Sequence, residues 1–194
     1  MNLEQIERLE AQARAEWDAS GRFYHNGTHL EDCLAQVETV HLAPDERRLL
    51  RWAIIWHDVV YDPKRSDNEA MSAERARAEL SGAGVPQAEA AEVARLILLT
   101  AGHRVEEGDR LGALLVSIDL SILGAKPERY RAYGEAIRRE YAHVPEDAYR
   151  LGRARVLRSL LAGGSIYPDP EYRARFEAQA RENMERELEE LRRG

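Results

Sequence analysis

The chain has 194 residues, of which 44% are hydrophobic and 32% are charged, and its net charge is −7. This composition is typical of a folded globular protein, and the length fits one domain over residues 1–194. The negative charge would repel a phosphate backbone, which argues against general nucleic-acid binding. Cys33 is the one cysteine, so no intramolecular disulfide can form. With no signal-peptide pattern and no apolar run near the roughly 18 residues of a membrane span, we expect a cytoplasmic protein without a membrane partner.

Apolar residues recur at helical spacing along nearly the whole chain, and proline and glycine fall between the periodic segments. No segment shows the alternation that would predict a sheet. We therefore predict an all-α fold, a single-domain bundle of about eight or nine helices. The expected helices span residues 3–19, 28–41, 45–60, 67–82, 86–101, 109–123, 127–142, 146–162 and 170–192.

The entry to the second helix carries two histidines. The dipeptide Asn26-Gly27 predicts a loop, and Thr28 with Glu31 three residues later fits a capping box, although Asn26 is a competing cap. If Thr28 is the cap, His29 lies in the first turn of the helix. His25 then lies outside it, so the two histidines would have different roles.

The third helix runs through one of the most apolar stretches of the chain, Leu49–Trp56, and leads directly into His57-Asp58. Adjacent helical residues point about 100° apart, so both reach one ion more easily near a helix end. The loop that follows holds two cations, Lys64 and Arg65. They are candidates for phosphate binding, or they belong to a solvated turn.

Further along the chain, several polar residues are candidates for helix capping, for substrate contact or for phosphate binding. Asp67 and Asp109 are expected to cap the helices that follow them. His103, after the fifth helix, is a candidate substrate contact. Arg138 and Arg153 either bind phosphate or form salt bridges, and the sequence does not separate these alternatives.

Among the ionisable residues, Asp119 lies most clearly on an apolar face of a predicted helix. Its neighbours three and four residues away are all apolar, which predicts that its carboxylate is buried: Leu115, Val116, Ile122 and Leu123. A buried charge is costly unless it is paired or binds a metal ion. From the residues alone, the ionisable groups on apolar faces are either hydrogen-bonded core residues or ligands of one site.

The last predicted helix, residues 170–192, is amphipathic. Apolar residues follow each other at three- and four-residue spacing along one stripe with charged flanks: Phe176, Ala180, Met184, Leu188 and Leu191. We expect this stripe to pack on the body of the protein or on a second copy in a homodimer.

The order His…His-Asp…Asp on predicted helices resembles the HD superfamily of metal-dependent phosphohydrolases. More narrowly, the chain resembles a bacterial subgroup known mainly as predicted HD phosphohydrolases. The segments that carry the resemblance are Tyr24-His25-Asn26-x-x-His29, Ile55–Asp62, Asp67-Asn68-Glu69 with Ser72-Ala73, Ile118–Gly124, Ile137-Arg138-x-Glu140-Tyr141, Gly152-Arg153 with Val156-Leu157, Ile166-Tyr167, and Glu177 with Ala180-Arg181-x-Asn183.

The resemblance implies one divalent metal ion on His29, His57, Asp58 and Asp119. Two imidazoles and two carboxylates suit Mn, Fe, Ni, Co or Zn, with Mg as a further option. It implies hydrolysis of a phosphate ester or anhydride of a small molecule, expected to be a nucleotide, by a metal-activated water. Asp58 and, by analogy with related cyclic-nucleotide phosphodiesterases, His25 are the expected catalytic residues. Ser117 departs from the subgroup, where we expect an acidic residue.

Two alternatives stay open at this point. The chain could be a non-catalytic metal- or nucleotide-binding regulatory HD module. Alternatively, the pairs Glu38-x-x-His41 and Glu140-x-x-His143 are half the ligand set of a di-iron helical bundle. We disfavour the di-iron protein because both histidines are predicted at helix ends, whereas a bundle site lies in the middle of its helices.

Overall fold

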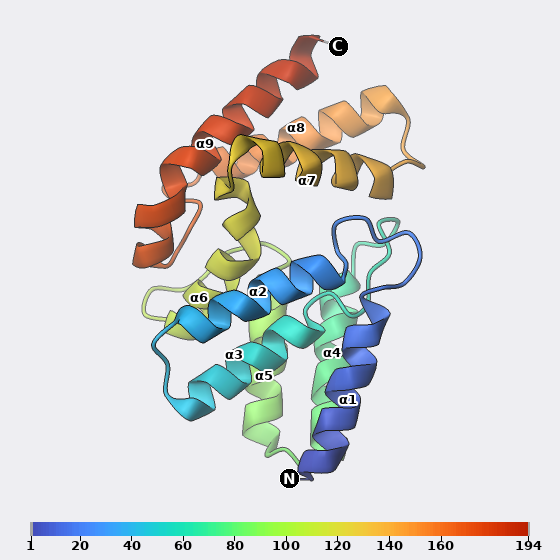
Figure 1. Cartoon of the computed structure of the whole chain (residues 1–194), viewed down its shortest axis with the longest axis vertical. Helices are drawn as coiled ribbons and strands as arrows, with labels where there is room; N and C mark the ends of the chain where they lie inside the picture. Colours follow the sequence, from blue (N-terminus) through green and yellow to red (C-terminus); the bar gives the residue numbers. More distant parts are fainter. Residues whose placement is uncertain (1, 194) are drawn as a thin grey trace. The chain divides into compact units, whose positions relative to one another are not determined.

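The computed structural model describes residues 2–193, and that part of the chain is built from helices alone (Figure 1). Within it there are nine α-helices, one short 3₁₀ helix and no strand, which confirms the predicted all-α class and helix number. No helix among these residues is both long and apolar enough to cross a membrane. The chain divides into two compact units between Val116 and Ser117. The expectation of one domain over residues 1–194 stays a prediction.

The first unit is organised around α3. Its elements are α1 (Leu3–Glu16), α2 (Gly27–Thr39), α3 (Pro44–Trp56), α4 (Asn68–Gly82), α5 (Gln87–Leu99) and the start of α6 (Arg110–Asp119). Helix α3 contacts α1, α2, α4 and α5, while α4 and α5 run side by side (Figure 1). Every residue from Trp52 to Trp56 is buried, so this apolar stretch lies at the centre of the unit.

Helix α2 begins one residue earlier than predicted. The Asn26 side chain accepts hydrogen bonds from the backbone N–H groups of Thr28 and His29, at 3.0 and 3.4 Å. The capping box centred on Thr28 is therefore wrong, and the competing cap is right. The expected placement holds, because His29 lies in the first turn and His25 lies before the helix.

Helix α3 ends at Trp56, four residues before the predicted end. Side chains of α4 bind the backbone that follows. The Ser72 hydroxyl accepts from the Val60 N–H at 3.1 Å, and the Asn68 amide pairs with both backbone groups of Asp62, at 3.1 and 2.8 Å. These bonds replace the helical ones, so the chain leaves the helix at His57.

The second unit holds η1 (Leu120–Gly124), α7 (Pro127–Glu140), α8 (Glu146–Ala162) and α9 (Pro170–Arg193), with η1 and α8 both packed on α9. Ala180, Met184 and Leu188 are buried along one face of α9, which confirms the predicted amphipathic stripe. The buried Asn183 side chain donates to the carbonyls of Leu123 and Ala125, each at 2.8 Å.

Arg138 and Arg153, the two arginines considered for phosphate binding, both form ion pairs in this unit. The buried Arg153 guanidinium donates to Glu187 at 2.7 Å and to the Tyr133 hydroxyl at 3.0 Å. Arg138 donates to Glu146 at 3.0 Å and to backbone carbonyls beyond α7. The structure thus supports the salt-bridge interpretation of both residues over phosphate binding.

Candidate metal centre

His29 is buried in the first turn of α2 among aromatic and sulfur groups. Its Nδ1 lies 3.1 Å from the Tyr24 hydroxyl, which precedes the helix. Cys33 follows one turn later, with Sγ 3.7 Å from the same nitrogen. The indole of Trp17 lies 6.0 Å away, ring centre to ring centre. The imidazole is therefore held on several sides by packing and by a hydroxyl.

His57 stands at the C-terminal end of α3, where its ring is oriented by the helix itself. Nδ1 lies 2.8 Å from the Ile54 carbonyl and donates to it, so Nε2 is the nitrogen that carries the lone pair. The ring lies 5.5 Å from that of His29, edge to face, and 5.0 Å from the indole of Trp17. This arrangement, with one ring nitrogen tied to a carbonyl, is common among metal-binding histidines.

Asp58 lies between two histidines of the first unit. Its Oδ2 is 3.4 Å from Nε2 of His57 and 4.0 Å from Nε2 of His25. The His25 ring stacks on Tyr61 at 4.3 Å with 27° between the planes. Asp58 and His57 are both buried, and the His25 side chain is only 22% exposed. The first unit alone therefore places two of the predicted site residues, His25 and His57, beside the carboxylate of a third, Asp58.

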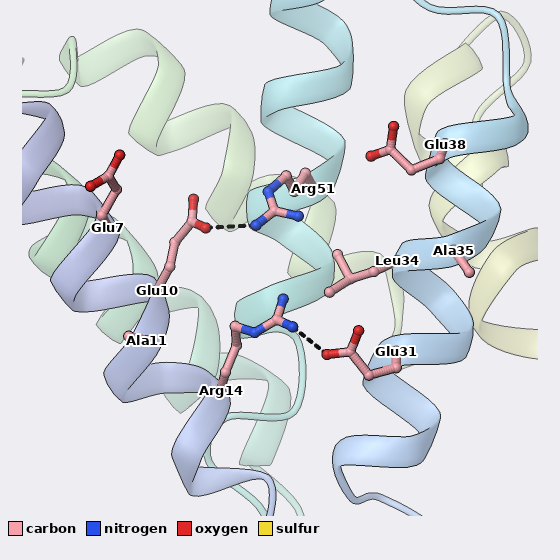
Figure 2. Close-up of a pocket in the computed structure, with 9 residues that line it drawn as sticks. All are labelled: Glu7, Glu10, Ala11, Arg14, Glu31, Leu34, Ala35, Glu38 and Arg51. Carbon is pink, nitrogen blue, oxygen red and sulfur yellow. Dashed lines mark hydrogen bonds and ion pairs between the residues drawn. The ribbon is translucent and has the colours of Figure 1, made fainter.

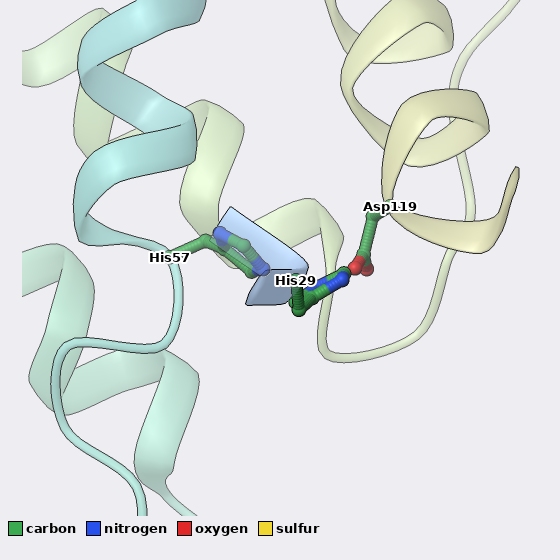
Figure 3. A group of neighbouring side chains, drawn as sticks. All are labelled: His29, His57 and Asp119. Atoms are coloured by element: carbon green, nitrogen blue, oxygen red, sulfur yellow. The ribbon is translucent and has the colours of Figure 1, made fainter. Parts of the chain in front are cut away.

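One ligand atom each from His29, His57 and Asp119 lies within 4.8 Å of the other two (Figure 3). Among residues 2–193 these three form the one group of His, Cys, Asp and Glu side chains that meets this distance, and they could hold a metal ion. Asp119 is the last residue of α6, the helix in which the division between the two units falls. Asp58 is not one of the three, although its carboxylate approaches His57.

The predicted burial of Asp119 is wrong, because the residue is partly exposed. Its upstream neighbours Leu115 and Val116 are buried as expected. Helix α6 ends at Asp119, however, and a 3₁₀ helix begins at Leu120. The three-and-four spacing of an α-helix does not continue into that turn, so Ile122 and Leu123 do not stand where helical spacing predicts them.

Arg22 was not singled out from the sequence, yet it is bound to the predicted site residues. Its guanidinium donates to the backbone carbonyls of His25, Asp58 and Val59. In the sequence it is one of many arginines in polar segments, and no local pattern marks it. Its contacts are long-range, and only the fold shows them.

The predicted substrate-binding cations are exposed. Arg65 pairs with Asp67 at 2.7 Å, so Asp67 stands at the start of α4 without capping it through its side chain. Lys64 is exposed, and its backbone N–H donates to Asp62. His103 has a φ of 52°, and its N–H donates to the Leu99 carbonyl at 2.8 Å, which closes α5. Contacts of Lys64, Arg65 and His103 with a substrate stay predictions.

Ser117, where an acidic residue was expected, is fully buried, and its hydroxyl accepts from the Asp169 N–H at 3.1 Å. It fixes the start of α9 within the second unit. The histidines of the di-iron alternative, His41 and His143, are both exposed and lie beyond the ends of their helices. Ligands of a bundle site project inward, so this exposure speaks against the di-iron alternative.

A separate groove of about 750 Å³ lies between α1, α2 and α3 (Figure 2). It is charged, and its cations are neutralised across it. Arg51 donates to Glu10 at 2.8 Å, and Arg14 pairs with Glu31. None of the predicted site residues lines this groove.

Comparison of the chain with protein-family models, with curated proteins and with solved structures finds no match. The resemblance to HD phosphohydrolases therefore stays a prediction.

Proposed function

We propose that the chain is a metal-dependent phosphohydrolase of the HD type, in which His29, His57, Asp58 and Asp119 bind one divalent metal ion. The observation that carries the proposal is the convergence of His29, His57 and Asp119. These residues are far apart in the sequence, and two of them are buried imidazoles. Buried polar side chains usually have a binding partner, such as a hydrogen-bond network or a ligand.

The donor set fits a transition-metal ion. Two imidazoles with carboxylate oxygens suit Mn, Fe, Ni, Co or Zn better than a cage made of oxygens alone. The hydrogen bond from His57 Nδ1 to Ile54 directs Nε2 toward the cluster as the donor atom. When bound, such an ion polarises a phosphoryl oxygen and acidifies water.

Asp58 and His25 are the residues that we propose for proton transfer. The Asp58 carboxylate is buried and lies within 4.0 Å of the His25 imidazole, so a proton can pass between them through a small movement or one water. In the proposed reaction Asp58 orients the attacking water and His25 protonates the leaving oxygen. The proposed substrate is a small phosphate ester or anhydride, with nucleotides as the first class to test.

A hydrolysis screen tests the proposal. Nucleoside mono-, di- and triphosphates and aryl phosphates are combined with Mn, Ni, Co, Fe, Zn and Mg, and phosphate or pyrophosphate release is measured. We expect turnover with at least one metal, its loss in Asp58→Asn, and its retention in the exposed control His41→Asn. Wild-type rates in Asp58→Asn would refute the role of Asp58. Nucleotide binding without hydrolysis in any combination would favour a regulatory module instead.

A further inference from the structure

Arg22 connects the two loops that carry His25 and Asp58. One terminal nitrogen, Nη1, donates to the Asp58 carbonyl at 2.7 Å and to the His25 carbonyl at 3.2 Å. The second terminal nitrogen, Nη2, donates to the Val59 carbonyl at 2.9 Å. Arg22 lies in the segment between α1 and α2, and Val59 lies between α3 and α4. A single side chain therefore fixes the backbone of one loop against that of the other.

Aromatic rings hold the guanidinium in place. Its central carbon lies 5.7 Å from the ring centre of Trp17 and 5.3 Å from that of Tyr61. Trp17 is fully buried, and its indole N–H donates to the Ile55 carbonyl at 3.0 Å. Tyr61 in turn stacks on the His25 ring. A planar, delocalised cation suits this position, because it stacks on rings and bonds several acceptors in its own plane.

The remaining backbone of the loop after α3 is held by α4. Ser72 bonds both backbone groups of Val60, and Asn68 bonds both backbone groups of Asp62. Helix α4 thus anchors the far part of the loop. The part that includes Asp58 is tied by Arg22, the residue that also reaches His25.

We propose that Arg22 is a positioning residue, which sets the separation between the His25 imidazole and the Asp58 carboxylate. Its consequence for turnover rests on the proposed function, whereas its effect on the two loops does not. Lysine at this position would keep the charge. Its ammonium group, however, lacks the planar array of donors with which a guanidinium bonds three carbonyls at once. The proposal therefore depends on the shape of the guanidinium and not on its charge.

The first test is amide hydrogen exchange on metal-free protein, comparing Arg22→Lys and Arg22→Gln with the wild type. The Val59 N–H donates to the carbonyl of Trp56, the last residue of α3, and the Asn26 N–H donates to that of Tyr24 in the other loop. We expect both amides to exchange about tenfold faster in either variant, as expected for the loss of one or two net hydrogen bonds.

Arg47→Gln is the matched control. Arg47 also donates to backbone carbonyls, those of Val37 and Val40 at the end of α2, but not to either of these loops. Its loss should leave the Val59 and Asn26 amides unchanged. Unchanged exchange in both Arg22 variants, or an equal effect in Arg47→Gln, would overturn the positioning role.

The second test applies once a hydrolysed substrate is known. We expect kcat to fall about tenfold or more in Arg22→Gly while KM changes little, since misplaced catalytic groups slow the chemical step more than binding. Added guanidinium ion should restore part of the lost rate, and methylammonium should not. If the loops loosen as expected but the wild-type protein hydrolyses nothing, the positioning role stands and the proposed function fails.

Discussion

The carboxylate of Asp109 stabilises the start of α6 through two interactions. Asp109 precedes the helix, and its Oδ1 accepts from the Gly112 N–H at 2.9 Å. The same carboxylate accepts from Arg95 at 2.6 Å. This confirms the predicted cap and adds an ion pair. Because α6 ends at Asp119, the cap anchors the helix that carries one of the candidate ligands.

Two variants separate the two interactions. Asp109→Asn keeps an oxygen for the cap and loses the charge, and Asp109→Ala loses both. The ion pair is worth about 0.2–1 kcal/mol, toward the lower end because the Arg95 side chain is 43% exposed and solvent screens it. The cap is worth about 1 kcal/mol. We therefore expect a loss of about 0.2–1 kcal/mol for Asn and about 1–2 kcal/mol for Ala.

The pH dependence provides the sharper test. Burial raises the pKa of the Asp109 carboxyl, but the bonds from Arg95 and Gly112 outweigh burial and hold the pKa below its usual range. A lowered folded-state pKa contributes stability that is present above the unfolded pKa, about 3.9, and is lost as the pH falls through the folded value. In urea unfolding, the difference between wild type and Asp109→Asn should be full at neutral pH and vanish in acid.

Either of two results would contradict these roles of Asp109. Equal destabilisation by Asn and Ala at neutral pH would show that the cap contributes nothing. A difference between wild type and Asn that does not shrink as the pH falls below the unfolded pKa of about 3.9 would show that the charge of Asp109 is not its cause.

Two further predictions concern buried groups. Arg153→Met should cost about 3 kcal/mol, because it removes the cation from the Glu187 carboxylate, whose side chain is only 15% exposed. Adding Glu187→Met in the same chain should recover much of that loss, and a double-mutant cycle in urea that shows simple additivity would contradict the prediction. Trp17→Phe should cost about 1–3 kcal/mol, because the buried Ile55 carbonyl loses its indole donor. Thermal unfolding of Trp17→Phe at the wild-type temperature would contradict this second prediction.

Helix positions were predictable because their signals are local. Pro44, Pro127 and Pro170 each open a helix, as the fixed φ of proline suits a first turn. Helix ends were less predictable because long-range bonds set them. Helix α3 stops at Trp56 since side chains of α4 bind the backbone that follows. The sequence does not show that these segments meet.

The candidate site was partly predictable for a physical reason. A histidine or aspartate beside apolar residues is conspicuous, and His57 and Asp119 were found in that way, whereas His29 was found by its place at the entry to a helix. The surroundings of Asp119 were not predictable, because the change from α-helix to 3₁₀ helix after it leaves no clear mark in the sequence. Arg22 was missed because an arginine in a polar loop looks like any other until its three carbonyl acceptors are seen.

The most direct test of the metal centre is the metal content and metal affinity of the protein itself. Purified wild-type protein is stripped of metal, titrated calorimetrically with Mn, Co, Ni and Zn, and compared with His57→Ala, Asp119→Ala and the exposed control His143→Ala. The proposed centre predicts one ion per chain in the wild type and in His143→Ala, with affinity lost in the other two variants. No binding by folded wild-type protein, or equal binding by His57→Ala, would contradict it.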